Sequence, residues 1–169
     1  ADGTVYRGVS FGAAGTVFGE IVFTTGVSGF QETLTDPSNF GQIVVQTFPS
    51  VGGYGVNKDD YASDRCHLSG YVVRSVTELP SNYKMTETLG QFVTEQGVVG
   101  IEDVDTRAIT RLLRDQGTMN GMITVEENPD VEAKLKLIRA YRVQGTVEKT
   151  SRSQMQIYPG SGPRVALLD

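Results

Sequence analysis

Residues 25–49, TGVSGFQETLTDPSNFGQIVVQTFP, contain the features that decide the fold of this chain. Gly26 and Gly29 bracket the first part of the stretch, where the backbone can turn tightly and approach another chain or a ligand closely. Phe30 and Leu34 follow, four residues apart, so that they share one face of a helical turn. The stretch therefore begins with a tight turn that leads into a short helix.

The second half of the stretch predicts a turn followed by a buried strand. Pro37 disfavours a helical conformation for the residue before it. Asp36, Ser38 and Asn39 can each hydrogen-bond neighbouring backbone groups. Residues 42–48 are rich in β-branched side chains, which is typical of a strand with at least one buried face. The Ser38 hydroxyl has two interpretations at this point: it caps backbone groups of the turn, which is the commoner role, or it points outward to a partner.

Length and composition are those of an ordinary acidic globular protein. The 169 residues suffice for one hydrophobic core, since a domain of this size buries about two-thirds of its unfolded surface. Fifteen Lys and Arg against twenty Asp and Glu give a net charge of −5, which argues against nucleic-acid binding. No run approaches the roughly 20 apolar residues that cross a bilayer, and residues 1–8 lack the features of a signal peptide. We therefore expect a cytoplasmic protein that does not bind membranes.

Alternating apolar patterns predict an α/β fold. Strands are expected at 4–10, 16–24, 42–48, 67–74, 98–102 and 119–125, and helices at 86–96 and 103–117. A last helix is expected to be capped by Asn128-Pro129. In the last helix, Val131, Leu135 and Ile138 are expected to face inward. Residues 50–64 are expected to form a long loop. We predict a mixed β-sheet with flanking helices, in which the β-α units around 86–125 supply a parallel portion.

The composition changes near residue 145. Residues 1–144 are expected to form one domain, whereas residues 145–163 are rich in Thr, Ser, Lys, Gln, Gly and Pro, as linkers are. Residues 164–169, RVALLD, are largely apolar and predict the first strand of a further domain.

Cys66 and His67 are the single thiol and the single imidazole of the chain, so a Cys-His catalytic pair would need both. Neighbouring residues on a strand point to opposite faces, which prevents the hydrogen bond that activates a thiolate. A zinc site needs three or four ligands, and Asp59, Asp60 and Asp64 lack the spacing of a calcium-binding loop. We therefore expect no catalytic residue, no metal site and no cofactor in this chain.

Three arginines lie on the helix expected at 103–117, whose first turn Asp103 or Asp105 can cap. Arg107, Arg111 and Arg114 are spaced by four and three residues, which places their guanidinium groups along one exposed face. Such a row is most often a solvated helix face. The alternative is a docking surface, because arginine is enriched where carboxylates are bound at protein interfaces.

Three motifs resemble a known family. Residues 29–38, GFQETLTDPS, resemble the GYQE-LTDPS segment of the small, glutamine-using subunit of carbamoyl-phosphate synthetase. Residues 103–114, DVDTRAITRLLR, resemble the D-DTR-LTR-LR helix of the same family, and residues 119–123 resemble the strand that follows it. The motifs occur in the family's order and extend over most of the chain. The resemblance covers the amino-terminal domain of that subunit and implies its swivelling β/β/α fold.

The resemblance implies a component of an enzyme. In the family, glutamine is hydrolysed and ammonia is channelled, so that bicarbonate and ATP are converted to carbamoyl phosphate for pyrimidine or arginine synthesis. The family's glutaminase nucleophile and histidine would lie beyond residue 169, and the chain alone is expected to be inactive. The implied partners are L-glutamine, a large synthetase subunit or domain, and the glutaminase domain of the same full-length chain, whose first strand would be residues 164–169.

The resemblance also implies roles for individual residues. Ser38 matches the serine that reaches across to the substrate glutamine on the glutaminase domain. The face formed by Arg107, Arg111 and Arg114 becomes a candidate for docking on the large subunit. The alternative function is a non-enzymatic α/β protein-binding module, unrelated to amidotransfer, that uses the loop 50–64 and the arginine face.

Overall fold

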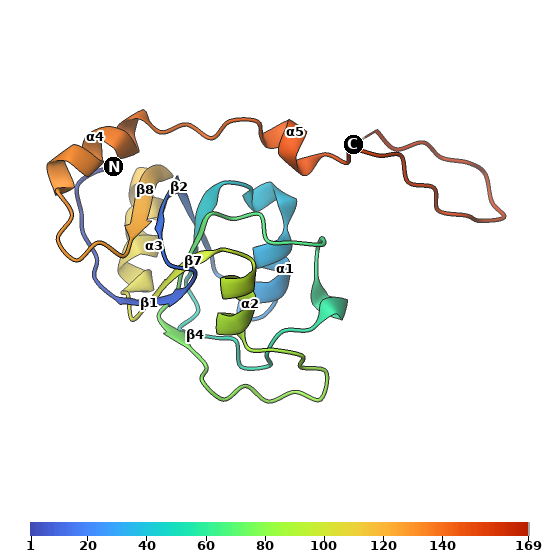
Figure 1. Ribbon diagram of the computed structural model, residues 1–169, viewed down its shortest axis with the longest axis horizontal. Helices are drawn as coiled ribbons and strands as arrows, with labels where there is room; N and C mark the ends of the chain where they lie inside the picture. The colour runs from blue at the N-terminus through green and yellow to red at the C-terminus, as the bar shows by residue number, and fades with distance from the viewer. Residues whose placement is uncertain (169) are drawn as a thin grey trace.

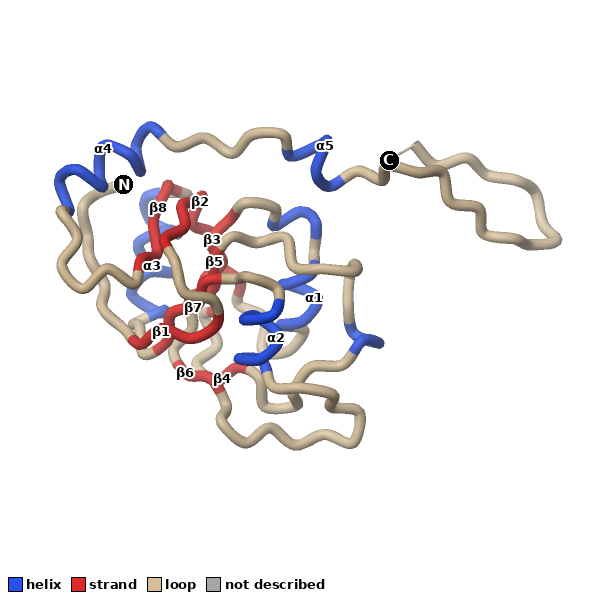
Figure 2. The backbone as a smooth tube through the Cα atoms, in the orientation of Figure 1, coloured by secondary structure: helices blue, strands red, loops and turns tan. Residues whose placement is uncertain are grey.

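The chain folds around a six-stranded mixed β-sheet with helices on both faces (Figure 1, Figure 2). The computed structural model describes residues 1–168. The strands of this sheet are β1 (Val9–Gly12), β2 (Thr16–Thr24), β3 (Gln42–Gln46), β5 (Gly70–Val72), β7 (Val99–Glu102) and β8 (Met119–Thr124). Their order is β1-β7-β5-β3-β2-β8. Two short strands, β4 (Ser50–Val51) and β6 (Ser75–Val76), form a separate parallel pair. The predicted α/β class with a mixed sheet is confirmed.

The helices lie between and after these strands. They are α1 (Phe30–Thr35), α2 (Leu89–Glu95), α3 (Thr106–Gln116), α4 (Val131–Ala140) and α5 (Thr146–Thr150), with the 3-10 turns η1 (Pro37–Asn39) and η2 (Lys58–Asp60). The side chains of α1 and α2 pack on one face of the sheet, and those of α3 pack on the other.

The central strands β7, β5, β3 and β2 are parallel, whereas the edge strands β1 and β8 are antiparallel to their neighbours. The chain moves from β2 to β3, β5 and β7 in one direction across the sheet, so connections of the same hand place α1 and α2 on the same face. The helix α3 then returns the chain over the opposite face to β8 at the far edge.

The prediction that the units around 86–125 form a parallel portion is wrong for β8. Met119, the first residue of β8, pairs with Ile21 near the end of β2, and β7 also ends at this side of the sheet. The helix α3 therefore crosses the strands instead of running back along them. Because β8 starts at the same end of the sheet at which β7 finishes, it runs antiparallel to its neighbour β2.

The strand β3 is buried on both faces. Ile43 and Val45 belong to the apolar cluster under α3, and Val44 belongs to the cluster under α1 and α2. None of these three side chains is more than 1% exposed. On the neighbouring strand β5, Tyr71 belongs to the cluster under α1 and α2, and Val72 belongs to the cluster under α3. Burial on both faces explains the unbroken apolar run in the sequence of this strand.

Buried polar groups fix the stretch between β2 and β3. Gly29 has a φ of 78°, in the left-handed region that glycine adopts without strain, and it begins α1. The Gln31 side chain is fully buried on that helix. Its Oε1 accepts a hydrogen bond from the Asn57 backbone N–H at 2.7 Å, and its Nε2 donates to Asp60 at 3.3 Å. The short helix is thus attached to the segment that follows β4.

Two predicted strands differ in their bounds. The strand expected at 4–10 is Val9–Gly12, because only these residues pair with β7. The strand expected at 67–74 ends after Val72, and the chain resumes as β6, which pairs with β4 outside the main sheet.

Two further predictions need correction. Residues 50–64 are not a simple surface loop, because they contain β4 and η2 and bury Val51 and Val56 in the core. The helix α4 is capped by Asp130, whose carboxylate accepts a hydrogen bond from the Ala133 N–H, and not by Asn128-Pro129 as predicted. Of its predicted inward residues Ile138 is buried and Leu135 is half-buried, but Val131 is 39% exposed.

The region after α4 has little regular structure. The helix α5 lies within the predicted linker 145–163, and residues 164–168 form no strand. Residue 169, which completes the strand predicted at 164–169, lies outside the described residues. The domain bounds 1–144, 145–163 and 164–169 stay predictions. None of the helices between residues 1 and 168 combines the length and the apolar character needed to cross a membrane.

Replacement of Gln31 by alanine is expected to destabilise the protein by about 2–4 kcal/mol, because it leaves the buried Asn57 N–H unpaired and opens a cavity. The free energy of unfolding, measured by urea denaturation, tests this. Glu32→Ala, on the exposed side of the same helix, is the matched control and should change that free energy by less than about 0.5 kcal/mol. Equal losses in the two variants would contradict the role given to Gln31.

Candidate functional site

Ser38 lies in the 3-10 turn η1 with its side chain exposed. The Asp36 carboxylate accepts a hydrogen bond from the Ser38 backbone N–H at 2.8 Å and so caps the turn. The Ser38 hydroxyl itself forms no hydrogen bond with any of residues 1–168. Asp36 thus fills the capping role that the sequence favoured for Ser38, and the serine hydroxyl is left facing solvent.

The turn that carries Ser38 is held in place on both sides. The Asn39 side-chain amide donates to the Thr33 carbonyl in α1 at 2.8 Å. The Phe40 N–H donates to the Pro37 carbonyl at 3.1 Å, which closes the turn. The backbone that carries Ser38 is therefore fixed, while the hydroxyl itself forms no hydrogen bond within residues 1–168 that would fix its rotamer.

The segment after α4 passes next to this turn (Figure 1). The Lys149 ammonium lies 5.7 Å from the centre of the Phe40 ring, within the range of a cation–π contact. The Arg65 guanidinium donates to the Lys149 carbonyl at 2.9 Å. A hollow of about 430 Å³ lies here, lined by these three residues and by Cys66, His67, Glu148, Ser151 and Ser153. The chain beyond α4 and the Ser38 turn thus meet on one side of the molecule.

His67 is buried beside this hollow and forms one hydrogen bond through its ring. Its Nε2 lies 2.9 Å from the Ser63 hydroxyl, which donates its own proton to the Thr35 carbonyl at 2.6 Å. We therefore assign the ring proton to Nε2, which donates to Ser63, and leave Nδ1 as an acceptor. Nδ1 is buried and has no partner within residues 1–168. Burial, and then the Arg65 charge, lower the pKa of His67, so the ring is neutral at pH 7.

Cys66 does not form a catalytic pair with His67. Burial raises the pKa of the Cys66 thiol to about 12, so the group is protonated at neutral pH and is a poor nucleophile. The His67 ring bonds Ser63 and not the thiol. Both residues precede β5, and His67 therefore does not lie on a strand, contrary to the range predicted at 67–74.

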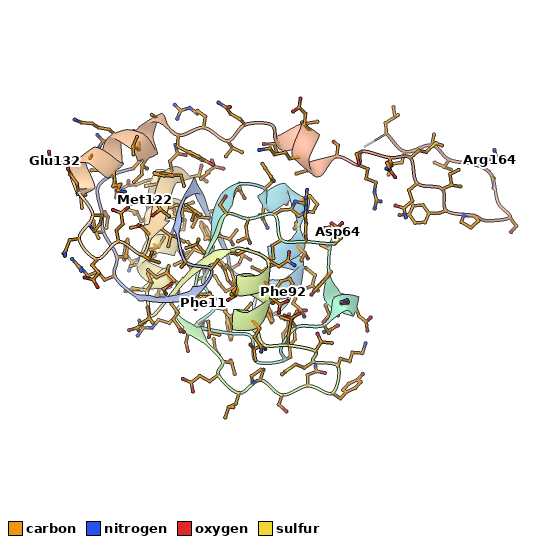
Figure 3. The ribbon with its side chains drawn as sticks, viewed as in Figure 1. Phe11, Asp64, Phe92, Met122, Glu132 and Arg164 are labelled. Carbon is orange, nitrogen blue, oxygen red and sulfur yellow. The ribbon has the colours of Figure 1, made fainter. Side chains whose placement is uncertain are left out.

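Of the three acidic residues considered for calcium, Asp59 and Asp60 have structural partners and Asp64 is exposed. Asp59 forms an ion pair with Lys84 at 3.0 Å. Asp60 accepts hydrogen bonds from Gln31 and from the Asn57 side chain, at 3.3 and 2.9 Å. Asp64 lies on the exterior of its segment (Figure 3). Within residues 1–168, no group of three or more His, Cys, Asp or Glu side chains is arranged to hold a metal ion.

The arginine face of α3 is exposed as predicted. Arg107, Arg111 and Arg114 are solvent-exposed, whereas Ile109 and Leu113 of the same helix are buried against the sheet. Arg114 pairs with the adjacent Asp115 at 3.0 Å. Arg107 and Arg111 form no ion pair within the described part of the chain. Ser38 follows α1 on the opposite face of the sheet, so the structure does not bring the serine and the arginine face together.

Comparisons with known proteins agree on one family. The family described as "Carbamoyl-phosphate synthase small chain, CPSase domain" matches residues 1–123. The chain is 41% identical over 169 residues to the carbamoyl phosphate synthase small chain of Listeria monocytogenes and 39% identical over 168 residues to that of Oceanobacillus iheyensis. Each match covers 99% of this chain and 46% of the relative. The chloroplastic small chain of Oryza sativa is 43% identical over 144 residues, 85% of this chain and 32% of the relative. The chain thus spans less than half the length of these relatives.

The lowered pKa of His67 predicts that acid weakens the fold. The unfolded chain binds a proton to this ring more readily than the folded protein, so the contribution of His67 to stability is complete above about pH 6.5 and is lost as the pH falls towards the folded pKa. We expect the free energy of unfolding to drop between pH 7 and pH 5 more steeply in the wild type than in His67→Gln, which keeps an N–H donor for Ser63. If the free energy of unfolding changed with pH equally in the two proteins over this range, the role given to His67 would be wrong.

Proposed function

The chain belongs to the carbamoyl-phosphate synthase small chain family, and we propose that it is the scaffold and docking domain of a glutamine-hydrolysing carbamoyl-phosphate synthase. The whole enzyme would convert glutamine, bicarbonate and ATP to carbamoyl phosphate, for pyrimidine or arginine synthesis. Ammonia would come from a glutaminase domain of the same full-length protein, and the synthetase chemistry would take place on a large subunit. A cytoplasmic location stays a prediction.

The observation that carries this proposal is the exposed Ser38 hydroxyl. Asp36 and Asn39 fix its turn, yet the hydroxyl has no partner of its own within residues 1–168. Because the backbone of the turn is already fixed, binding a ligand through this hydroxyl needs to order only the serine side chain. The contact of Lys149 with Phe40 brings the segment after α4 to the same turn. We assign Ser38 a hydrogen bond to L-glutamine bound on the glutaminase domain.

The arginine face supports docking on a large subunit. Arg107 and Arg111 are exposed and unpaired within the described residues, so their guanidinium groups are available to carboxylates of another protein. Arg114 shares its charge with Asp115 and would contribute less. Family membership leaves the alternative, a binding module unrelated to amidotransfer, without support.

Ser38→Ala in the complete small chain is expected to raise the KM for glutamine by about 3- to 10-fold, the cost of one neutral hydrogen bond. Synthesis of carbamoyl phosphate from added ammonia should not change, because that reaction needs no glutamine. Steady-state kinetics with each nitrogen source makes this comparison. Ser28→Ala, an exposed serine at the other end of α1, serves as the control. An unchanged KM in Ser38→Ala would remove the main support for the proposal.

Residues 1–169 alone are expected to release no ammonia from glutamine above the rate in buffer. The Cys66 thiol is protonated at neutral pH and the His67 ring is bonded to Ser63, so His67 does not activate Cys66 as a nucleophile. An ammonia assay on the isolated segment tests this, with the full-length small chain as the positive control. Turnover that disappears in Cys66→Ser would show that the segment carries a nucleophile after all.

A further inference from the structure

The two most exposed large apolar side chains of residues 1–140 lie in one loop. Leu79 is 89% exposed and Tyr83 is 94% exposed, whereas the other exposed large apolar side chains in this range are between 37% and 69% exposed. The loop, residues 77–86, leads from β6 towards α2. Single apolar residues on a protein surface are common and need no explanation. Two large apolar side chains that are almost fully exposed and only four residues apart do require an explanation.

The backbone of this loop is fixed to the segment 51–56 at three points. Its N–H groups donate to carbonyl groups of that segment, from Thr77 to Val51 at 2.9 Å, from Ser81 to Gly53 at 3.0 Å and from Thr86 to Val56 at 2.8 Å. Val51 and Val56 are only 4% and 0% exposed. The loop is therefore bound to the core of the protein along its length.

Some side chains between these points contact the rest of the protein, whereas others are left exposed. Lys84 pairs with Asp59 at 3.0 Å, and its N–H donates to the Asn82 side chain at 2.8 Å. Met85 covers Gly55 so closely that a Cβ added there would lie 2.3 Å from the Met85 Cγ. Leu79 lies between the first and second points of attachment, and Tyr83 between the second and third. The loop thus packs one apolar side chain inward while it holds two others in water.

An ordered loop that exposes apolar side chains is prepared for binding. Because the backbone is already fixed, association costs little additional loop ordering. Burial of a fully exposed side chain of this size contributes about 1.5–3 kcal/mol. Tyrosine is also among the residues most often found to dominate the energy of a protein interface. Leu79 and Tyr83 have the properties of interface anchors.

The position of the loop separates it from the Ser38 turn. In Figure 1 the loop lies at the lower edge of the molecule, whereas α5 passes over the upper edge. The base of the loop instead adjoins the start of α3. The Val76 N–H donates to the Glu102 carboxylate at 3.0 Å, and Arg74 forms an ion pair with Asp103 at 2.9 Å. Asp103 precedes Arg107 by four residues in the sequence. The base of the loop and the start of α3 therefore lie at the same end of the central strands, although the segment 51–56 that holds the loop packs on the α1 and α2 face and α3 packs on the other.

We propose that the loop 77–86 docks on the large synthetase subunit, with Leu79 and Tyr83 as apolar anchors. The surface it meets has an apolar recess for these two side chains and carboxylates that face Arg107 and Arg111. The identity of this partner rests on the proposed function. The anchors Leu79 and Tyr83 lie in a loop distinct from the turn of Ser38, so the two proposed contacts use different residues.

Binding of the full small chain to the purified large subunit of the same organism, followed by calorimetry, tests the proposal. The double variant Leu79→Ser, Tyr83→Ser is expected to raise the Kd by at least about 30-fold, as the loss of anchor residues does. Leu137→Ser removes an apolar side chain that is 56% exposed on α4 and should leave the Kd within about twofold. Thermal unfolding of each small chain alone should be unchanged, because all three side chains are exposed.

Other outcomes would overturn the proposal in distinguishable ways. An unchanged Kd in the double variant would show that the loop is not at the interface, while the proposed function would stand. A wild-type small chain that forms dimers, lost in the double variant on sedimentation, would make a second copy the partner. Failure of the wild-type small chain to bind the large subunit at all would overturn the proposed function together with this inference.

Discussion

Burial of β3 on both faces is the constraint on which the rest of the structure depends. Ile43 and Val45 require one apolar layer and Val44 requires another, so helices must cover both sides of the sheet. The short helix α1 supplies part of one layer immediately before the strand, and η1 connects the two. Ser38 stands where it does because this connection must leave the core within a few residues and return to it.

The sequence predicted the elements with clear local signals and missed those decided by distant partners. The helix α3 combines a capping aspartate, a buried stripe and a final glycine, and only its cap was ambiguous: Asp105 accepts the hydrogen bond, while Asp103 takes a φ of 59° before it. The direction of β8 depends on where a helix delivers the chain. The break between β5 and β6 depends on β4, which is more than twenty residues away in the sequence.

In the candidate site, too, local features were predictable from the sequence and contacts between distant residues were not. A proline turn with a polar serine was visible in the sequence, but Asp36 and Ser38 offer equivalent capping groups, and only geometry shows which one is used. The bond between Arg65 and the Lys149 carbonyl joins residues that are 84 positions apart, and neither residue type signals it. The exposed position of Arg107 and Arg111 was predictable because it follows from helix periodicity alone.

The contact between Arg65 and the segment after α4 has an evolutionary consequence. The guanidinium binds a backbone carbonyl, which every residue possesses. This hydrogen bond can therefore form with almost any residue at position 149. The contact with Phe40, by contrast, depends on a cation at that position. Homologous sequences can therefore drift through this segment while its path past the serine persists, provided that an arginine is retained at position 65.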